Sequence, residues 1–469
     1  MRFSALLLGL GLLAPAFAQA QERDAVTDRP QPSGVIDADV ESEGVIPVTT
    51  RRNADGSWTL LRGGEPYFIR GVGGQTQLDQ AVAIGANSIR TWGAGEAIAI
   101  LDEAHARGLT VTFGLWVGQE RQGFDYNDAK AVTAQLERFR EVVRTYKDHP
   151  AILIWGVGNE NDLFYDDFKV WDAINDIAEM IHEEDPNHPV MTVTAGLDVA
   201  EVKLIQDRAP GIDIYGLNTY GELAGGTREF RSWGYEGEDV GVLLRRAGWD
   251  KPYVIAEWGP DGHWEVPTTS WGVPIEQTSR QKAEVYRYRY ERGIAADTTH
   301  LVGSYVFLWG QKQETTPTWY GLFTEDGNET EVMDELQYVW TGAYPENRSP
   351  SLLSFTANGK DAFADVMVAP RETLTFEAEV TDADGDPITY TWELLPESTD
   401  IRAGGDAENR PDAVSLDVVR RTGGTLAIRA PRREGSYRMF LYATDGNGNA
   451  AVANLPFYVG TPPTTTASR

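Results

Sequence analysis

Between residues 67 and 308, short apolar runs alternate with longer stretches in which apolar residues recur every three or four positions. The short runs are rich in β-branched residues and lack polar alternation, which is typical of strands buried on both faces. The longer stretches, such as 130–146 and 167–183, collect their apolar side chains on one face of a helix. The predicted strands are residues 67–73, 86–92, 110–117, 151–158, 189–195, 212–218, 252–257 and 301–308.

Eight strand–helix units of this size predict an α/β protein with a (β/α)₈ (TIM) barrel, which we place at residues 45–345. An open, doubly wound sheet is the alternative, but no glycine-rich phosphate loop follows the first strand to support it. Two turn signals between short β-type runs in residues 45–70 predict a small hairpin that leads into the barrel.

The pattern changes near residue 345. Residues 344–350 have the composition of a linker, and beyond them runs such as 374–380 and 437–441 alternate with a period of two. We therefore expect a small C-terminal β-sandwich at residues 350–460 and a disordered tail at 461–469. Asp382, Asp384 and Asp386 are candidate calcium ligands, although such clusters in sandwich turns are more often simple turns.

The N-terminus has the pattern of a cleaved signal peptide. Arg2 precedes an apolar run at residues 3–17, and Ala18-Gln19-Ala20 supplies a small-x-small cleavage site. We expect a signal peptide at residues 1–20, a flexible leader at 21–44, and a periplasmic or secreted protein. No other apolar run is long enough to span a bilayer, so we expect no membrane insertion.

Composition excludes several classes of partner and chemistry. The chain has 41 Lys and Arg residues against 71 Asp and Glu residues, a formal charge of −30, which repels nucleic acid and anionic lipid. It has no cysteine, so disulfides, thiol catalysis and cysteine-bound metals are excluded. The six histidines lack metal-ligand spacing and no serine nucleophile elbow is present, so we expect neither a metal nor a cofactor.

Two predicted strands end abruptly in a carboxylate. The fourth runs into Asn159-Glu160, and the seventh runs into Glu257. Each glutamate alone could simply cap a helix. Because the working groups of a barrel lie at the C-terminal ends of its strands, both are expected at one mouth. Two facing carboxyls suit cleavage of a glycosidic bond, in which one is a protonated acid and the other an ionised nucleophile.

The segments Trp-Gly-Val-Gly-Asn-Glu and Ala-Glu-Trp-Gly, which contain these glutamates, resemble the two signatures of glycoside hydrolase clan A. The resemblance implies that Glu160 is the general acid/base, Glu257 the nucleophile of a retaining reaction, and Asn159 a ligand of the sugar 2-hydroxyl. It also implies that Arg90 keeps the nucleophile ionised and that Tyr220 hydrogen-bonds it. A structural ion pair for Arg90 and core packing for Tyr220 are the alternatives.

Within the clan, the resemblance is closest to the barrel of family 2, with some likeness to the family 72 β-1,3-glucanosyltransferases. Residues 67–72, 83–90 and 319–322 carry it. There are departures from both families. Family 2 enzymes normally have β-domains before the barrel, for which this leader is too short. Family 72 enzymes have cysteines, whereas this chain has none. The C-terminal part resembles the PKD and cadherin-like modules of exported enzymes.

Tryptophans follow several of the predicted strands. Because the apolar faces of sugars stack on indole rings, such residues suit an oligosaccharide cleft. By the resemblance, Trp309 would form the floor of the first sugar site, with core packing as the alternative. We expect about half of the tryptophans to face the cleft. The candidate substrate-binding residues are Arg90, Trp92, Trp116, Asn159, Tyr220, Trp258, Trp309 and Trp319.

Together these features predict an exported, retaining β-glycoside hydrolase that acts on a β-linked glucan or a related oligosaccharide through a glycosyl-enzyme intermediate. A transglycosylase with the same two glutamates is the nearest alternative. A non-catalytic carbohydrate-binding protein on an inactive barrel belongs to another class. The C-terminal module is a candidate for attachment to glycan or to the cell envelope.

Overall fold

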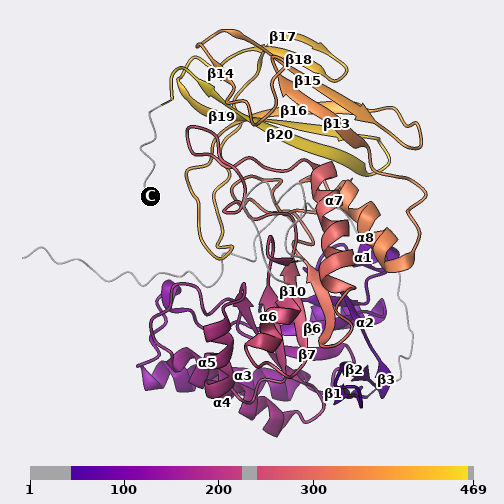
Figure 1. Ribbon diagram of the computed structural model, residues 1–469, viewed down its shortest axis with the longest axis vertical. Helices are drawn as coiled ribbons and strands as arrows, with labels where there is room; N and C mark the ends of the chain where they lie inside the picture. The colour runs from indigo at the N-terminus through magenta and orange to yellow at the C-terminus, as the bar shows by residue number, and fades with distance from the viewer. Residues whose placement is uncertain (1–43, 224–239, 463–469) are drawn as a thin grey trace, which may run out of the picture.

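The computed structural model of the protein describes residues 44–223 and 240–462. Eight parallel strands close into a barrel in the order β10-β11-β4-β5-β6-β7-β8-β9 (Figure 1). Each of them overlaps one predicted strand. They are β4 (Ile69–Gly73), β5 (Ser88–Arg90), β6 (Thr110–Leu115), β7 (Ile152–Val157), β8 (Val190–Ala195), β9 (Ile214–Asn218), β10 (Tyr253–Trp258) and β11 (Leu301–Val306).

The barrel strands are almost wholly buried, which explains their continuous apolar runs. Helices cover their outer side, and α3 and α4 lie where the two amphipathic stretches predicted them. Asp128 fixes the start of α3 by accepting hydrogen bonds from the amides of Lys130 and Ala131. The helices are α1 (Leu78–Ala83), α2 (Ala97–Ala106), α3 (Ala129–Tyr146), α4 (Lys169–Glu184), α5 (Val199–Arg208), α6 (Val240–Arg246), α7 (Ser279–Arg289) and α8 (Glu331–Thr341).

A small antiparallel sheet closes the N-terminal end of the barrel. It consists of β1 (Val48–Arg52), β2 (Trp58–Arg62) and β3 (Glu65–Pro66), where the sequence predicted a hairpin. The amide of Val48 donates to the carbonyl of Asn187 at 2.7 Å, and the amide of Trp58 donates to the carbonyl of Thr299 at 2.6 Å. Both acceptors precede barrel strands, so the open mouth lies at the opposite end.

The C-terminal residues form two packed sheets, as predicted. One has the order β12-β20-β19-β16, with β14 also paired to β20, and the other has the order β13-β15-β18-β17. Their core includes Phe376, Trp392, Leu426 and Phe457. The strands are β12 (Glu329–Thr330), β13 (Ser351–Ala357), β14 (Met367–Val368), β15 (Thr373–Thr381), β16 (Thr389–Pro396), β17 (Asp417–Thr422), β18 (Thr425–Arg429), β19 (Gly435–Thr444) and β20 (Asn449–Val459).

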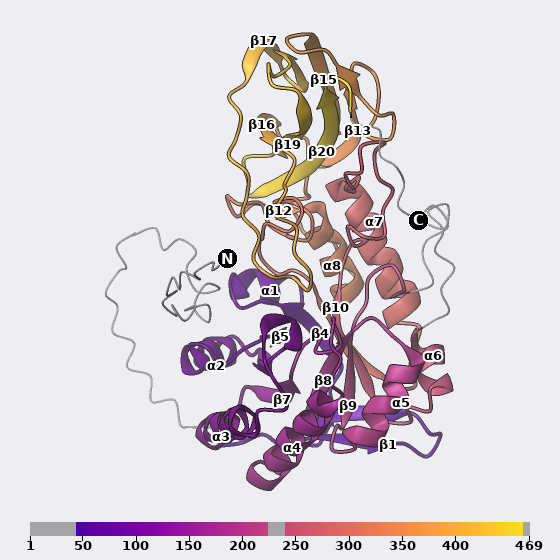
Figure 2. The same cartoon turned by 90° about the vertical axis from the view of Figure 1, so that its left-hand side faces the viewer.

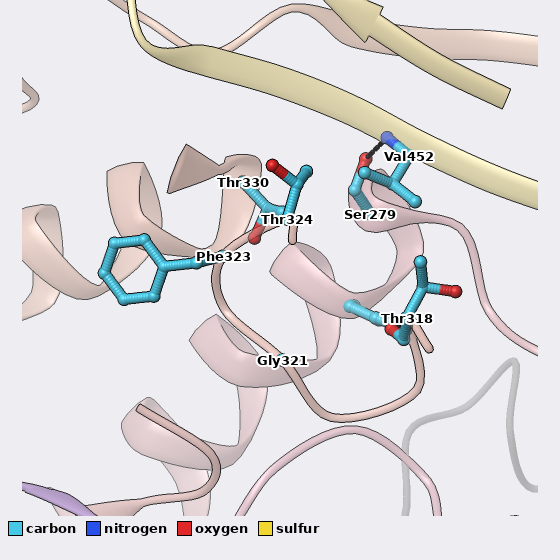
Figure 3. Close-up of a pocket in the computed structure, with 8 residues that line it drawn as sticks. Ser279, Thr318, Gly321, Phe323, Thr324, Thr330 and Val452 are labelled. Atoms are coloured by element: carbon cyan, nitrogen blue, oxygen red, sulfur yellow. Dashed lines mark hydrogen bonds between the residues drawn. The ribbon is translucent and has the colours of Figure 1, made fainter. Parts of the chain in front are cut away.

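The sandwich packs against the barrel through α7, α8 and the loops that follow β10 and β11 (Figure 2). The amide of Val452 on β20 donates to Ser279 Oγ at 3.0 Å, beside a small pocket at this interface (Figure 3). The buried carboxyl of Glu276 accepts from Asn454 at 2.5 Å and pairs with Lys282 at 2.6 Å. These contacts place the sandwich at the mouth end of the barrel.

The three aspartates that were candidate calcium ligands have protein partners. Asp382 accepts from the amides of Asp384 and Asp386, which makes this segment an ordinary turn. Asp384 also accepts from the amide of Arg348 at 2.7 Å. Within residues 44–223 and 240–462, no three histidine, cysteine, aspartate or glutamate side chains gather in an arrangement suited to a metal.

None of the helices in the described residues combines the length and apolarity needed to cross a bilayer. The predicted signal peptide, nearly all of the predicted leader and most of the predicted tail lie outside the described residues.

Candidate active site

Glu160 and Glu257 both lie at the mouth of the barrel. Glu257 is the next-to-last residue of β10, and Glu160 is the third residue after β7. A chain of hydrogen bonds joins the two carboxyls. Asn218 Nδ2 donates to Glu160 Oε1 at 2.8 Å and to Asn159 Oδ1 at 3.1 Å. Arg90 donates to Asn159 Oδ1 at 2.7 Å and to Glu257 Oε1 at 2.9 Å.

The carboxyl of Glu257 is surrounded by donors. Its Oε1 accepts from Arg90 Nη1 at 2.9 Å and from Trp92 Nε1 at 2.8 Å, and its Oε2 accepts from the Tyr220 hydroxyl at 3.2 Å. Arg90 is itself buried, and it also donates to the carbonyl of Ala256 at 2.9 Å. Three donors therefore converge on one carboxyl and hold it in a fixed orientation.

Glu160 is held in a different environment. Desolvation in the mouth, reinforced by the negative charge of Glu257, raises the pKa of Glu160 to about 8, while the hydrogen bond from Asn218 acts in the opposite direction. The backbone of Glu160 has a φ of 50°, a left-handed conformation that costs a non-glycine residue energy and that clusters at functional sites. The two carboxyls therefore differ in the way that an acid and a nucleophile must.

The structure brings five of the predicted substrate-binding residues to the mouth. Arg90, Trp92 and Tyr220 contact Glu257, and Asn159 lies between the two glutamates. Trp116 directly follows β6 at the same end of the barrel and is half-buried.

The other three predicted substrate-binding residues pack in the interior instead. Trp258 is 0% exposed and lies against Tyr286 of α7, with the ring centroids 5.1 Å apart. Because adjacent residues of a strand face opposite sides, Glu257 faces the mouth and Trp258 faces the helices. Trp309 is 2% exposed, donates to the carbonyl of Thr76 at 2.8 Å, and belongs to the barrel core. For both residues the prediction of sugar contact was wrong.

Trp319 is also buried, at 1% exposed, in an aromatic cluster beneath the mouth. Its Nε1 donates to the carbonyl of Asp261 at 3.0 Å, and its ring lies edge-on to His263, 5.9 Å away. Trp319 therefore supports other aromatic residues and presents no surface to a sugar, contrary to the prediction.

Several residues of the site were not among the predicted ones. Asn218 ends β9 and is the only residue described here that donates to both Asn159 and Glu160; its place at a strand end was the available signal. Phe307 follows β11 and lies edge-on to Trp92, 5.9 Å away. Trp264 is 60% exposed and lies edge-on to Tyr220 at 5.8 Å, so it offers an indole ring to solvent beside a residue that contacts Glu257.

Residues 89–342 match the family described as "Glycosyl hydrolases family 2, TIM barrel domain". Similar solved structures include a β-glucuronidase of Bacteroides uniformis, with 15% identity, a TM-score of 0.47, and 88% of this chain and 48% of that chain covered. A β-glucuronidase of Faecalibacterium prausnitzii has 18% identity and a TM-score of 0.47, with 63% of this chain and 52% of that one covered. One from Bifidobacterium dentium, complexed with coumarin-3-O-glucuronide, has 20% identity and a TM-score of 0.45, with 64% and 50% covered. The chain spans about half the length of these proteins.

Proposed function

The chain belongs to glycosyl hydrolase family 2, and from that premise we propose that it hydrolyses β-glycosidic bonds with net retention of configuration. Glu257 is the nucleophile and Glu160 the general acid/base. The observation that carries the proposal is the hydrogen-bonded path from Glu160 through Asn218, Asn159 and Arg90 to Glu257. It ties two carboxyls with different environments into one site.

In the first step, a carboxylate oxygen of Glu257 attacks the anomeric carbon while the bond from that carbon to the leaving oxygen breaks. Oε1 is held by Arg90 and Trp92, whereas Oε2 has a single, longer contact to Tyr220 at 3.2 Å. Oε2 is therefore the freer oxygen for attack. The leaving oxygen takes the proton of Glu160, which a pKa of about 8 keeps in place at neutral pH.

In the second step, Glu160 acts as a base. Formation of the glycosyl ester removes the negative charge of Glu257, which is one cause of the raised pKa of Glu160. The pKa of Glu160 therefore falls, and its carboxylate can accept a proton from water. That water attacks the anomeric carbon, and the bond to Glu257 breaks, which returns both carboxyls to their starting states.

The proposed substrate is a β-linked glucan or a related oligosaccharide, and the proposed location is outside the cytoplasm. The substrate class is supported by the clan resemblance and by indole rings at the mouth, of which Trp264 is exposed and Trp92 touches the nucleophile. The location is supported by the signal-peptide pattern in residues 1–20. N-terminal sequencing of the mature protein tests the location, because an intact Met1 would contradict it.

Product analysis on a panel of β-linked glucans, galactans and mannans tests the activity. The wild type, Glu257→Ala and Glu160→Ala are compared, with Glu183→Ala on the exposed face of α4 as a matched control. We expect shorter products from the wild type and the control, and a loss of at least about a thousand-fold in kcat for Glu257→Ala.

The two active-site variants are further distinguished by azide. In a retaining enzyme, azide restores turnover of an activated glycoside to Glu160→Ala because it attacks the glycosyl ester without needing a base. Equal activity of Glu257→Ala and the wild type would refute the nucleophile assignment. Products longer than the substrate would instead indicate transfer of the glycosyl group to another sugar.

A further inference from the structure

A long connection of the sandwich reaches the mouth of the barrel. It joins β16 to β17 across residues 397–416 and extends toward the barrel from the sandwich in Figures 1 and 2. Its tip contacts the loop that follows β6. Arg121 pairs with Asp406 at 2.7 Å and donates to the carbonyl of Ala403 at 3.2 Å, and Gln122 donates to Asp406 at 3.0 Å. The side chain of Arg121 is 9% exposed and that of Asp406 is 34% exposed, so this ion pair is partly shielded from solvent.

The same tip is also held by a second loop of the barrel. Lys312, in the loop that follows β11, donates to the carbonyl of Gly405 at 2.6 Å. The amide of Thr315 donates to the carboxylate of Glu408 at 2.6 Å. Residues 403–408, which we call the bridging segment, are thus attached at two places on the rim of the barrel.

The bridging segment is held by the loops that follow β6 and β11, and the barrel loops between these two are short. Strands β4 and β5 lie between β11 and β6 in the barrel order. Only residues 74–77 connect β4 to α1, and only residues 91–96 connect β5 to α2. These short loops leave the rim low on that side, which is also the side of Arg90 and Trp92.

The attachment points are next to the residues that hold the two glutamates. Gln119, two residues before Arg121, donates to the carbonyl of Asn159 at 2.6 Å. A side chain at Gly404 would come within 3.1 Å of Leu163, which is three residues after Glu160. On the other side, the ammonium of Lys312 lies 6.0 Å from the centroid of the Phe307 ring.

From this placement we infer that the bridging segment is the end wall of the substrate site, and that the enzyme consequently removes sugars from a chain end. This inference rests on the proposed function. A cleft open at both ends admits the middle of a polymer, whereas a wall across one end admits only a terminus. The sandwich is then part of the catalytic unit, and its connection between β16 and β17 determines specificity.

The test compares the position of cleavage in full-length variants. In one variant two glycines replace residues 402–408, which removes the wall but leaves Glu397, Arg410 and the core residues beyond them. Asp406→Ala removes the contacts of this carboxylate with Arg121 and Gln122 and leaves the contacts made by Lys312 and Thr315. Asp417→Ala is the matched control, because its ion pair with Arg371 at 2.8 Å is exposed on the sandwich.

The assay uses end-labelled β-linked oligosaccharides of the series that the wild type cleaves fastest, with a short chromogenic β-glycoside as reference. We expect the wild type and Asp417→Ala to release only terminal sugars in the first turnovers. In the shortened variant, the ratio of internal to terminal cleavage should rise at least about ten-fold, and measurable turnover of the short glycoside shows that the variant still folds and cleaves. Asp406→Ala should also raise the ratio of internal to terminal cleavage, and this variant decides the question if the shortened variant does not fold.

Internal cleavage by the wild type from the start, or an unchanged ratio in folded variants, overturns the inference and leaves the proposed function intact. A wild type that cleaves no β-glycoside of the panel refutes the proposed function, and the inference fails with it. The two failures are therefore distinct results.

Discussion

Replacing Glu160 with glutamine should make the folded chain more stable above about pH 5, although it removes the proposed acid. The folded state raises the pKa of Glu160 from 4.5 to about 8, so it binds this proton more tightly than the unfolded chain does. The stability that results is fully present below about pH 4.5 and is lost as the pH rises through about 8. Glutamine resembles the protonated acid at every pH and avoids that loss.

The size of the effect follows from the shift. At about 1.4 kcal/mol per pKa unit, a rise from 4.5 to about 8 corresponds to at most about 5 kcal/mol in the free energy of unfolding. Glu160 keeps some contact with solvent at the mouth, and solvent relaxes part of that cost. We therefore expect the free energy of unfolding of Glu160→Gln to be about 2 kcal/mol larger than that of the wild type at pH 8. Near pH 4.5 the two should not differ.

Urea unfolding at several pH values between 4.5 and 8.5, followed by tryptophan fluorescence, measures this difference. Glu183→Gln, exposed on α4, is the control and should follow the wild type at every pH. A gap between Glu160→Gln and the wild type that stays constant with pH would refute the reasoning. So would a variant less stable than the wild type at pH 8, because Glu160 would then be stabilised as a carboxylate.

Three other changes test separate parts of the molecule. Asn218→Ala should lower kcat/KM about ten- to a hundred-fold and shift the alkaline limb of its pH profile to higher pH, because the hydrogen bond from Asn218 lowers the pKa of Glu160. An alkaline limb at the same pH as in the wild type would contradict this. Trp309→Phe should cost about 1–3 kcal/mol of stability and leave KM unchanged, because Trp309 packs in the core. A raised KM would instead indicate that Trp309 contacts the sugar. Lys282→Met should cost about 3–5 kcal/mol in thermal unfolding because Glu276 is left as an unpaired buried charge, and adding Glu276→Gln should recover part of it.

The barrel and its two glutamates could be predicted because both leave local signals in the sequence. Strands buried on two faces read as continuous apolar runs, so each predicted strand overlaps a strand of the barrel. A carboxylate that ends such a run is conspicuous for the same reason, as at Glu160 and Glu257. The structure places both at one mouth, and their catalytic roles remain predictions.

Other features depend on which way a side chain faces or on contacts between distant residues. Trp258 adjoins Glu257 in sequence but faces the helices, and Trp309 turns into the core after β11. The composition of a strand end does not distinguish these orientations. Arg121 and Asp406 are 285 residues apart, and neither segment carries a local pattern that indicates the other. The reach of the sandwich to the mouth was therefore not predictable.

The pairing of β12 with β20 bears on how the two parts of the chain can be separated. Residues 329–330 precede α8, yet they pair in parallel with residues 449–450, and β14 pairs with the other end of β20. An exposed strand edge is a template for association between molecules, and these two short strands protect it. A fragment cut at the linker would lose one of the two protectors together with the barrel surface that covers β20. The sandwich is thus not an independent module. A fusion protein that carries it without residues 329–330 would expose the edge of β20 and would tend to aggregate.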